Sequence, residues 1–460
     1  MNRFTRRSFA TTAAAGFFSA TGAGKAAAVS GKAGSFGHLL EGIGRENIKI
    51  TQVKVTPLTY TAPAGKYVHE AGPIILSSQN CTIVEVFTDR GIVGIGPGSE
   101  GRPLRPSTDF SPLIGRNPFD VELLGLPPGL DIACWDIIGK AKGVPVYRLL
   151  ATDHPPNPKV RVYASGGVNW TFYDRGDGKP YGADALIEEA LRYKQMGFDT
   201  FKWRPGTDWE AAGITAGKLG NTVCRKLREA VGPDFKLGLE KKAWDCWTVE
   251  EALEIAPILN DLKFYFFEQP MMDIGPSQFD DYQKLKAAMP NVMLWGGENF
   301  RNLDDARPFI ERGIYHAIQS DTIRLGITGN WYVARVAAYY GAKIVPHNWT
   351  TALGTMCNTH FVAGVPTGFM CEYFLYPNTP WRDELFTEPM SPKNGCVTLS
   401  GKPGFGMELA SVEELKKKYP YNPKAPGLSA NPRFPEAMDR ARAREQQVAN
   451  KYRQPARRMP

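Results

Sequence analysis

Eight short apolar segments recur between residues 159 and 373, and stretches with helical periodicity separate them. The segments are Val160–Ala164, Phe198–Trp203, Lys236–Glu240, Phe264–Phe267, Val292–Trp295, Ala317–Ser320, Lys343–Pro346 and Gly368–Tyr373. The later segments follow one another at intervals of about 23 to 30 residues, the length of one strand–helix unit. Strands that alternate with helices indicate a parallel sheet, and eight such units favour a closed β/α barrel over residues 159–373.

A different pattern precedes the barrel. Residues 48–60 alternate apolar and polar side chains, and residues 81–95 read as two strands around an Asp89-Arg90-Gly91 turn. Residues 130–141 predict an amphipathic helix whose apolar face is Leu130, Ala133, Cys134, Ile137 and Ala141. We therefore expect an α+β domain over residues 46–150.

The net charge of +8 belongs to the two ends of the chain. Residues 1–35 contain five basic residues and no acidic ones, and residues 411–460 carry about +7, which leaves about −4 for the body. An acidic body argues against a nucleic-acid-binding groove. We interpret residues 411–460 as a basic, solvated tail without chemistry.

Residues 1–34 have the features of an export signal. Thr5-Arg6-Arg7-Ser8-Phe9 resembles the twin-arginine motif, and Ala26-Ala27-Ala28 offers a cleavage site. The apolar stretch between them is too short and too rich in Gly and Ala for a stable membrane span. The sequence thus predicts a periplasmic protein, the alternative being a chance arginine pair. Seven scattered cysteines without a C-x-x-C pair predict neither a zinc module nor a disulfide framework.

Ionisable residues end seven consecutive predicted strands, on the barrel face where chemistry occurs. They are Lys202 with Arg204, then Glu240, Glu268, Glu298, Asp321, His347 and Glu372. Three carboxylates on adjacent strands (Glu240, Glu268, Glu298) would repel one another unless a cation lies between them. A hard divalent cation with oxygen ligands meets this need, so we predict one Mg²⁺ ion per subunit.

The remaining residues suggest proton transfer. Asp321 and His347 lie on neighbouring strands, and a carboxylate that orients the imidazole makes His347 a candidate general base. Lys202 and Arg204 share one strand face, and we expect them on the far side of the pocket. Such a site favours removal of the proton α to a substrate carboxylate, with metal and cations stabilising the resulting anion.

Several motifs resemble the enolase superfamily, in its mandelate racemase/muconate lactonizing group. They are residues 130–150 (LDIACWDIIGKAKGVPVYRLL), Phe267-Glu268-Gln269-Pro270, Gly297-Glu298-Asn299, Val345-Pro346-His347-Asn348-Trp349 and Cys371-Glu372-Tyr373. The resemblance implies a modified (β/α)8 barrel, (β/α)7β, capped by an N-terminal α+β domain, with residues 374–410 returning to that domain. It also implies metal ligands at Glu240, Glu268 and Glu298, the His347–Asp321 dyad, and an acidic residue at Glu372 that can hydrogen-bond or protonate the substrate.

Two positions depart from the family pattern. The second lysine of K-x-K, a base in the family, is Arg204 here, and arginine stays protonated. A racemase needs bases on both faces of its substrate, whereas a dehydratase can use His347 alone. At strand three, Glu240 replaces the usual Asp, Lys242 stands two residues beyond it, and Asp245 is an alternative ligand.

We therefore expect a dehydratase that converts a sugar acid (aldonate or aldarate) into a 2-keto-3-deoxy acid. A racemase, epimerase or cycloisomerase for another carboxylate, and a non-catalytic protein that binds organic acids, remain open. The substrate is a small carboxylate whose identity we expect loops 60–80 and 97–110 to set. Trp349 is a candidate pocket wall and His360 a structural histidine. The resemblance also implies a homo-oligomer.

Overall fold

In the computed structural model, the described residues are 39–64, 67–71, 74–99, 103–167, 183–205, 213–241, 247–349, 351–375, 379–430 and 437–452. The predicted export signal (residues 1–34), Lys242 and Asp245 lie outside them. Within these ranges, no helix is both long enough and apolar enough to serve as a transmembrane span.

The N-terminal domain is built on an antiparallel sheet in the order β1-β4-β5. Its strands are β1 (Ile50–Thr61), β4 (Ser78–Thr88) and β5 (Val93–Pro97), and the helices are α1 (Pro128–Lys142) and α2 (Val146–Leu150). Glycines on β5 let α1 approach the sheet closely, since a Cβ on Gly94 would lie 2.1 Å from the carbonyl oxygen of Ala133. The predicted helix is confirmed as α1, but its burial is not confined to the predicted apolar face, because Pro128 through Gly139 are all buried.

The predicted barrel is confirmed. A parallel sheet runs in the order β12-β11-β10-β9-β8-β7-β6-β13. The strands are β6 (Lys159–Ser165), β7 (Thr200–Trp203), β8 (Lys236–Glu240), β9 (Phe266–Glu268), β10 (Met293–Gly296), β11 (Ala317–Ile318), β12 (Lys343–Ile344) and β13 (Cys371–Phe374). The two edges meet just before β13, where Ile344 forms a parallel bridge with Gly368. The Phe369 N–H also donates to the Ile344 carbonyl (3.0 Å), which closes the sheet into a barrel.

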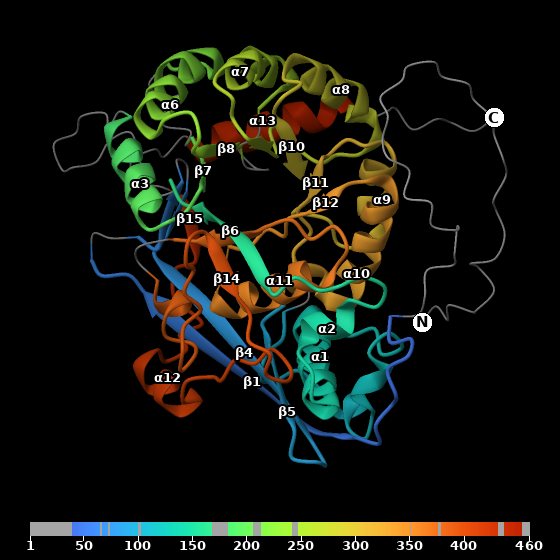
Figure 1. Ribbon diagram of the computed structural model, residues 1–460. Helices are drawn as coiled ribbons and strands as arrows, with labels where there is room; N and C mark the ends of the chain where they lie inside the picture. The colour runs from blue at the N-terminus through green and yellow to red at the C-terminus, as the bar shows by residue number, and fades with distance from the viewer. Residues whose placement is uncertain are drawn as a thin grey trace, which may run out of the picture. The chain divides into compact units, whose positions relative to one another are not determined.

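Helices follow the strands and line the outside of the barrel (Figure 1). They are α3 (Asp184–Gln195), α5 (Ala216–Leu219), α6 (Arg225–Val231), α7 (Val249–Asp261), α8 (Phe279–Ala288), α9 (Leu303–Glu311), α10 (Thr322–Tyr340) and α11 (Ala352–Gly364). The start of α7 is fixed by a capping box between Thr248 and Glu251. Asp321 caps α10 by accepting a hydrogen bond from the Ile323 N–H.

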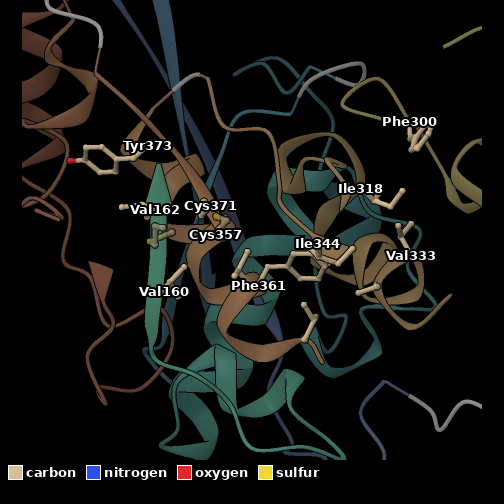
Figure 2. Close-up of a cluster of buried hydrophobic side chains, with 14 of the residues drawn as sticks. Val160, Val162, Phe300, Ile318, Val333, Ile344, Cys357, Phe361, Cys371 and Tyr373 are labelled. Atoms are coloured by element: carbon tan, nitrogen blue, oxygen red, sulfur yellow. The ribbon is translucent and has the colours of Figure 1, made fainter. Parts of the chain in front are cut away.

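Alternation along the strands separates two apolar clusters. Outward-facing side chains such as Val160 and Val162 on β6 pack with Cys357 and Phe361 of α11 in the main core (Figure 2). A second cluster contains Tyr163, Phe266, Trp295, Ala317, Val345 and Met370. Within this second cluster the rings of Phe266 and Trp295 are stacked, with their centroids 3.7 Å apart. The barrel interior is therefore filled with side chains below the carboxyl ends of its strands.

The chain then leaves the barrel through β14 (Cys396–Thr398), which pairs antiparallel with β6. The Phe405 N–H donates to Oδ1 of Asp136 on α1 (2.9 Å), so the segment after residue 374 contacts the N-terminal domain.

The last described elements are α12 (Val412–Lys418), β15 (Leu428–Ala430) and α13 (Ala437–Tyr452). β15 joins the short strands β2 (His69–Ala71) and β3 (Ile74–Leu76) in a three-stranded sheet. The prediction of a solvated tail is wrong for α13, because Val448 and Tyr452 are buried against the barrel.

Candidate active site

The candidate site lies at the carboxyl end of the barrel strands. Inward positions deeper in the barrel carry the aromatic side chains of Tyr163, Phe266 and Trp295. One step further along the strands, inward positions carry charged groups. Lys202 precedes the last residue of β7, Glu240 and Glu268 end β8 and β9, and Glu372 lies within β13. Because the aromatic layer excludes water from below, these charges depend on one another for stabilisation.

Three carboxylates converge as predicted. Oxygen atoms of Glu240, Glu268 and Glu298 all lie within 4.8 Å of one another, and all three residues are buried. Glu298 stands two residues beyond β10, after Gly297, whose φ is 96°. A Cβ at Gly297 would lie 2.3 Å from the ring of Phe300, so only glycine permits this turn. Local backbone chemistry therefore places the third carboxylate beside the other two.

Lys202 differs from its predicted position. Its Nζ lies 2.6 Å from Glu240, 2.7 Å from Glu268 and 2.8 Å from Glu372, within the carboxylate cluster and not on the far side of the pocket. Burial alone would lower the pKa of Lys202, but the three carboxylates raise it above its ordinary value. Lys202 is therefore a fixed positive charge in this arrangement and not a free base.

Arg204 lies beside the same acids. Its Nη2 is 2.7 Å from Oε2 of Glu240 and 3.5 Å from Oε1 of Glu372. The expectation that it stands apart from the metal-ligand candidates is also wrong. A guanidinium at this point neutralises carboxylates and can hold an oxyanion, but it cannot accept a proton.

The carboxylates outnumber the cations. Glu240, Glu268, Glu298, Asp321 and Glu372 face Lys202, Arg204 and His347, so these eight side chains carry two excess negative charges when all of them are ionised. Burial, together with Glu240 and Glu372, raises the pKa of Glu268 to about 8. Oε2 of Glu268 and of Glu298 are buried without a hydrogen-bond partner among the described residues. The acidic triad therefore fits one divalent cation in charge and in donor type.

His347 and Asp321 form the predicted pair. The His347 Nδ1 lies 3.1 Å from Oδ2 of Asp321, and Nε2 lies 3.5 Å from Oε2 of Glu298. The N–H of Ile323 and the side-chain amide of Asn358 donate to Oδ1 of Asp321, which fixes its carboxylate. Burial opposes a charged imidazole, yet Glu298, Asp321 and Glu372 raise the pKa of His347 to about 9. The ring nitrogen that faces the triad is thus Nε2.

Glu372 is held as a carboxylate. Burial opposes its ionisation, but Lys202, His347 and Arg204 lower its pKa to about 2. Its Oε2 accepts the backbone N–H of Asn348 at 2.9 Å. Asn348 directly follows His347, so this bond joins β13, which carries Glu372, to the loop that carries the histidine.

Sequence reasoning missed a group of residues behind the triad. Asp273 accepts hydrogen bonds from the hydroxyl of Tyr315 and, at 3.0 Å, from the side-chain amide of Gln269. Gln269 follows Glu268 directly and has a φ of 41°, a value that non-glycine residues rarely adopt. The only available signal was the acidic residue five positions after Glu268, in a loop that offers no periodicity.

Other predicted residues lie elsewhere. Trp349 packs against Phe374 beside the site. His360 lies on α11, buried against Tyr147 and Phe405, away from the charged cluster. Lys242 and Asp245 lie outside the described residues, so Glu240 is the candidate ligand from β8 that the structure describes.

Comparisons with known proteins agree with this fold. The family described as enolase C-terminal domain-like matches residues 185–413. The chain is 28% identical to D-galactarolactone cycloisomerase of Agrobacterium fabrum (71% of this chain, 88% of that protein) and 28% identical to arabinonate dehydratase of Saccharolobus solfataricus (63% and 72%). A crystal structure of an enolase superfamily member from Polaromonas sp. JS666 has the same fold, with a TM-score of 0.68 at 24% identity (82% of this chain, 99% of that one).

Proposed function

The chain belongs to the enolase superfamily, and from this premise we propose that it dehydrates an acid sugar (aldonate or aldarate) to a 2-keto-3-deoxy acid. One observation carries the proposal. The site combines a carboxylate triad with a single His–Asp pair, His347–Asp321, while Arg204 occupies the position of a second base. Arabinonate dehydratase is among the similar proteins.

Glu240, Glu268 and Glu298 would hold Mg²⁺, which supplies a Lewis acid that polarises the substrate carboxylate and stabilises negative charge next to it. Each of the three offers one ligand oxygen, and these oxygens lie within 4.8 Å of one another. When all eight charged groups of the cluster are ionised, their two excess negative charges match one divalent ion. This is the basis for proposing one ion per subunit.

His347 is positioned to move the proton. Asp321 holds Nδ1, so Nε2 is the atom that takes the proton α to the substrate carboxylate. Glu298 contributes to the raised pKa of His347, and neutralising Glu298 would therefore bring that pKa back toward its ordinary range. The protonated His347 can then assist departure of the β-hydroxyl, so that one residue serves both steps. Lys202 and Arg204 supply fixed positive charge near the developing anion.

Incubation of the purified protein and Mg²⁺ with a library of aldonic and aldaric acids tests the proposal. We expect a 2-keto-3-deoxy product from at least one acid, and loss of that product when His347→Asn is used. His154→Asn is a matched control, because His154 also pairs with an aspartate, Asp153, at 3.1 Å, but on the surface. A His347→Asn variant with full turnover would contradict the assignment.

A second candidate is an isomerase, and the similarity to a cycloisomerase favours it. Reactions run in D₂O distinguish the dehydratase from the isomerases by their products. Deuterium at the α-carbon in both configurations without loss of water indicates a racemase or epimerase, and a rearranged lactone indicates a cycloisomerase. A chain that binds these acids without converting any of them would be the non-catalytic binder.

We also propose that residues 1–34 direct export to the periplasm through Thr5-Arg6-Arg7-Ser8-Phe9. Fractionation of cells that express the full chain should recover it outside the cytoplasm in processed form. An Arg6→Lys/Arg7→Lys double variant should remain inside. Equal distribution of the two proteins would contradict the proposal.

A further inference from the structure

A neutral side chain lies among the charged groups at the carboxyl ends of the strands. It belongs to Gln319, which directly follows β11 and is only 1% exposed. Neither Nε2 nor Oε1 of Gln319 has a hydrogen-bond partner among the described residues. Buried polar groups of folded proteins are nearly always paired, so an amide that finds no protein partner points to a ligand or a water molecule.

Alternation along the strand directs Gln319 into the site. Ala317 belongs to the cluster inside the barrel, whereas Ile318 packs in the main core outside the sheet (Figure 2). Asp321, two residues beyond Gln319, contacts His347 in the site. Gln319 lies at the two-residue spacing between Ala317 and Asp321, so its side chain faces the barrel interior as theirs do.

The backbone of Gln319 is fixed on both sides. Its N–H donates to the carbonyl of Gly296 at 2.8 Å, and its own carbonyl accepts the N–H of His347 at 3.1 Å. Gly296 ends β10 and stands two residues before Glu298. Gln319 therefore lies between the strand that leads to a metal-ligand candidate and the loop that carries the general base.

The chemistry of the amide matches a hydroxyl group. Oε1 of Gln319 accepts a hydrogen bond and Nε2 donates one, and a hydroxyl can serve both atoms. The positive charges of Lys202 and Arg204, which suit a carboxylate, come from β7. In the closed sheet β7 and β11 are four positions apart and therefore lie opposite each other. The neutral amide thus suits a hydroxyl of the substrate and not its carboxylate.

We propose that Gln319 binds the β-hydroxyl of the substrate, the group that leaves in the dehydration. His347 acts on the α-proton and then on this hydroxyl, and Gln319 is the backbone-bonded neighbour of His347. The inference rests on the proposed function and adds a residue that selects the configuration at the β-carbon, since only one epimer directs its hydroxyl toward β11. A site that hydrogen-bonds a hydroxyl also rejects analogues without it.

Calorimetric titrations of the full chain with Mg²⁺ test the assignment, in a His347→Asn background that stops turnover. The probes are the acid that the wild type converts fastest (gluconate where none is converted) and its 3-deoxy and 2-deoxy analogues. With Gln319 present, the 3-deoxy acid should bind about tenfold more weakly than the parent acid. With Gln319→Met, the two should bind within about twofold of each other. Gln283→Met is the control, because Gln283 is an exposed glutamine on α8, and it should preserve the tenfold difference.

Thermal melts distinguish a binding residue from a structural one. Methionine has a side chain of similar length without the amide, and the replacement breaks no side-chain hydrogen bond among the described residues. The melting temperature of Gln319→Met without substrate should therefore be unchanged or higher, because a buried polar group is removed. A clear fall in melting temperature would show that Gln319 supports the fold and would overturn the proposal.

Equal discrimination against the 3-deoxy acid with and without Gln319 would also overturn the proposal. So would a loss of discrimination confined to the 2-deoxy acid, since this places the amide at the α-hydroxyl. A wild-type protein that converts no acid contradicts the proposed function, whereas the titrations with the gluconate series still judge Gln319. Gluconate and 3-deoxygluconate that bind equally well, or not at all, would then remove Gln319 from a hydroxyl site as well.

Discussion

The ammonium nitrogen of Lys202 lies 2.6 Å from Oε2 of Glu240, a member of the acidic triad. The lysine therefore shares carboxylate oxygens with any cation that the triad binds. In the absence of that cation, Lys202 supplies much of the positive charge that keeps three buried carboxylates together. The two cations stabilise the same group of acids, and their effects on stability are linked.

Replacement of Lys202 by Met should make folding depend on the metal. Removing one partner of a buried ion pair costs about 3–5 kcal/mol, so the metal-free variant should melt well below the wild type. Added Mg²⁺ should raise its melting temperature more than that of the wild type, while turnover is lost. Lys236→Met is the control, because Lys236 pairs with Asp199 at the opposite end of β8. Equal Mg²⁺-induced shifts in the two variants would contradict the linkage.

Sequence periodicity was sufficient for the barrel because inward and outward positions differ in chemistry. Leu237 and Leu239 face the outer core while Glu240 ends the strand, and this contrast is visible without coordinates. The position of Lys202 Nζ could not be inferred in the same way. A strand pattern gives the side of the sheet, but a four-carbon stem can reach several partners. The sheet of β2, β3 and β15 escaped prediction because three-residue strands show no period.

Asp321→Asn separates the two functions of that residue. Asparagine caps helices as well as aspartate does, so the start of α10 and the melting temperature should change little. The variant loses the carboxylate that orients His347, and we expect kcat to fall by about 10² to 10⁴. Steady-state kinetics and thermal melts measure the two effects. A large drop in melting temperature without a loss of kcat would show that Asp321 acts only as a cap.

Asp273→Asn should weaken metal binding without unfolding the protein. The carboxylate receives hydrogen bonds from Tyr315 and Gln269, and Gln269 adjoins Glu268. An amide cannot accept all of these bonds in the same orientation, so Glu268 should lose its fixed position. Titration calorimetry should show Mg²⁺ affinity reduced by about 10- to 100-fold. Asp280→Asn, at an exposed neighbouring position, should bind as the wild type does; unaltered affinity in Asp273→Asn would remove it from the site.

The buried side chain of His360 should make the free energy of unfolding depend on pH. Burial lowers its pKa from 6.5 to about 3, so between these values the unfolded chain binds a proton that the folded chain does not. Stability should therefore fall as the pH is lowered from 6.5 toward 3, with a slope of up to about 1.4 kcal/mol per pH unit from this group. His360→Phe keeps a ring against Tyr147 and Phe405, and it should lose the pH-dependent contribution of His360 to stability. Urea unfolding of both proteins at several pH values measures it, and parallel pH curves would refute the assignment.

Arg204→Lys asks whether the arginine alone keeps the site from acting as a racemase. A lysine at this position would stand near Glu240 and Glu372, the acids that already raise the pKa of Lys202. We expect it to stay protonated, so that dehydration continues at about a tenth of the wild-type rate and no α-deuteration with inversion occurs in D₂O. Arg204→Gln, which removes the charge, should lose considerably more activity because the anionic intermediate loses a stabilising cation. Inversion in Arg204→Lys would instead mean that the carboxylates do not hold that lysine in its charged form, and that the nature of residue 204 decides between a lyase and a racemase.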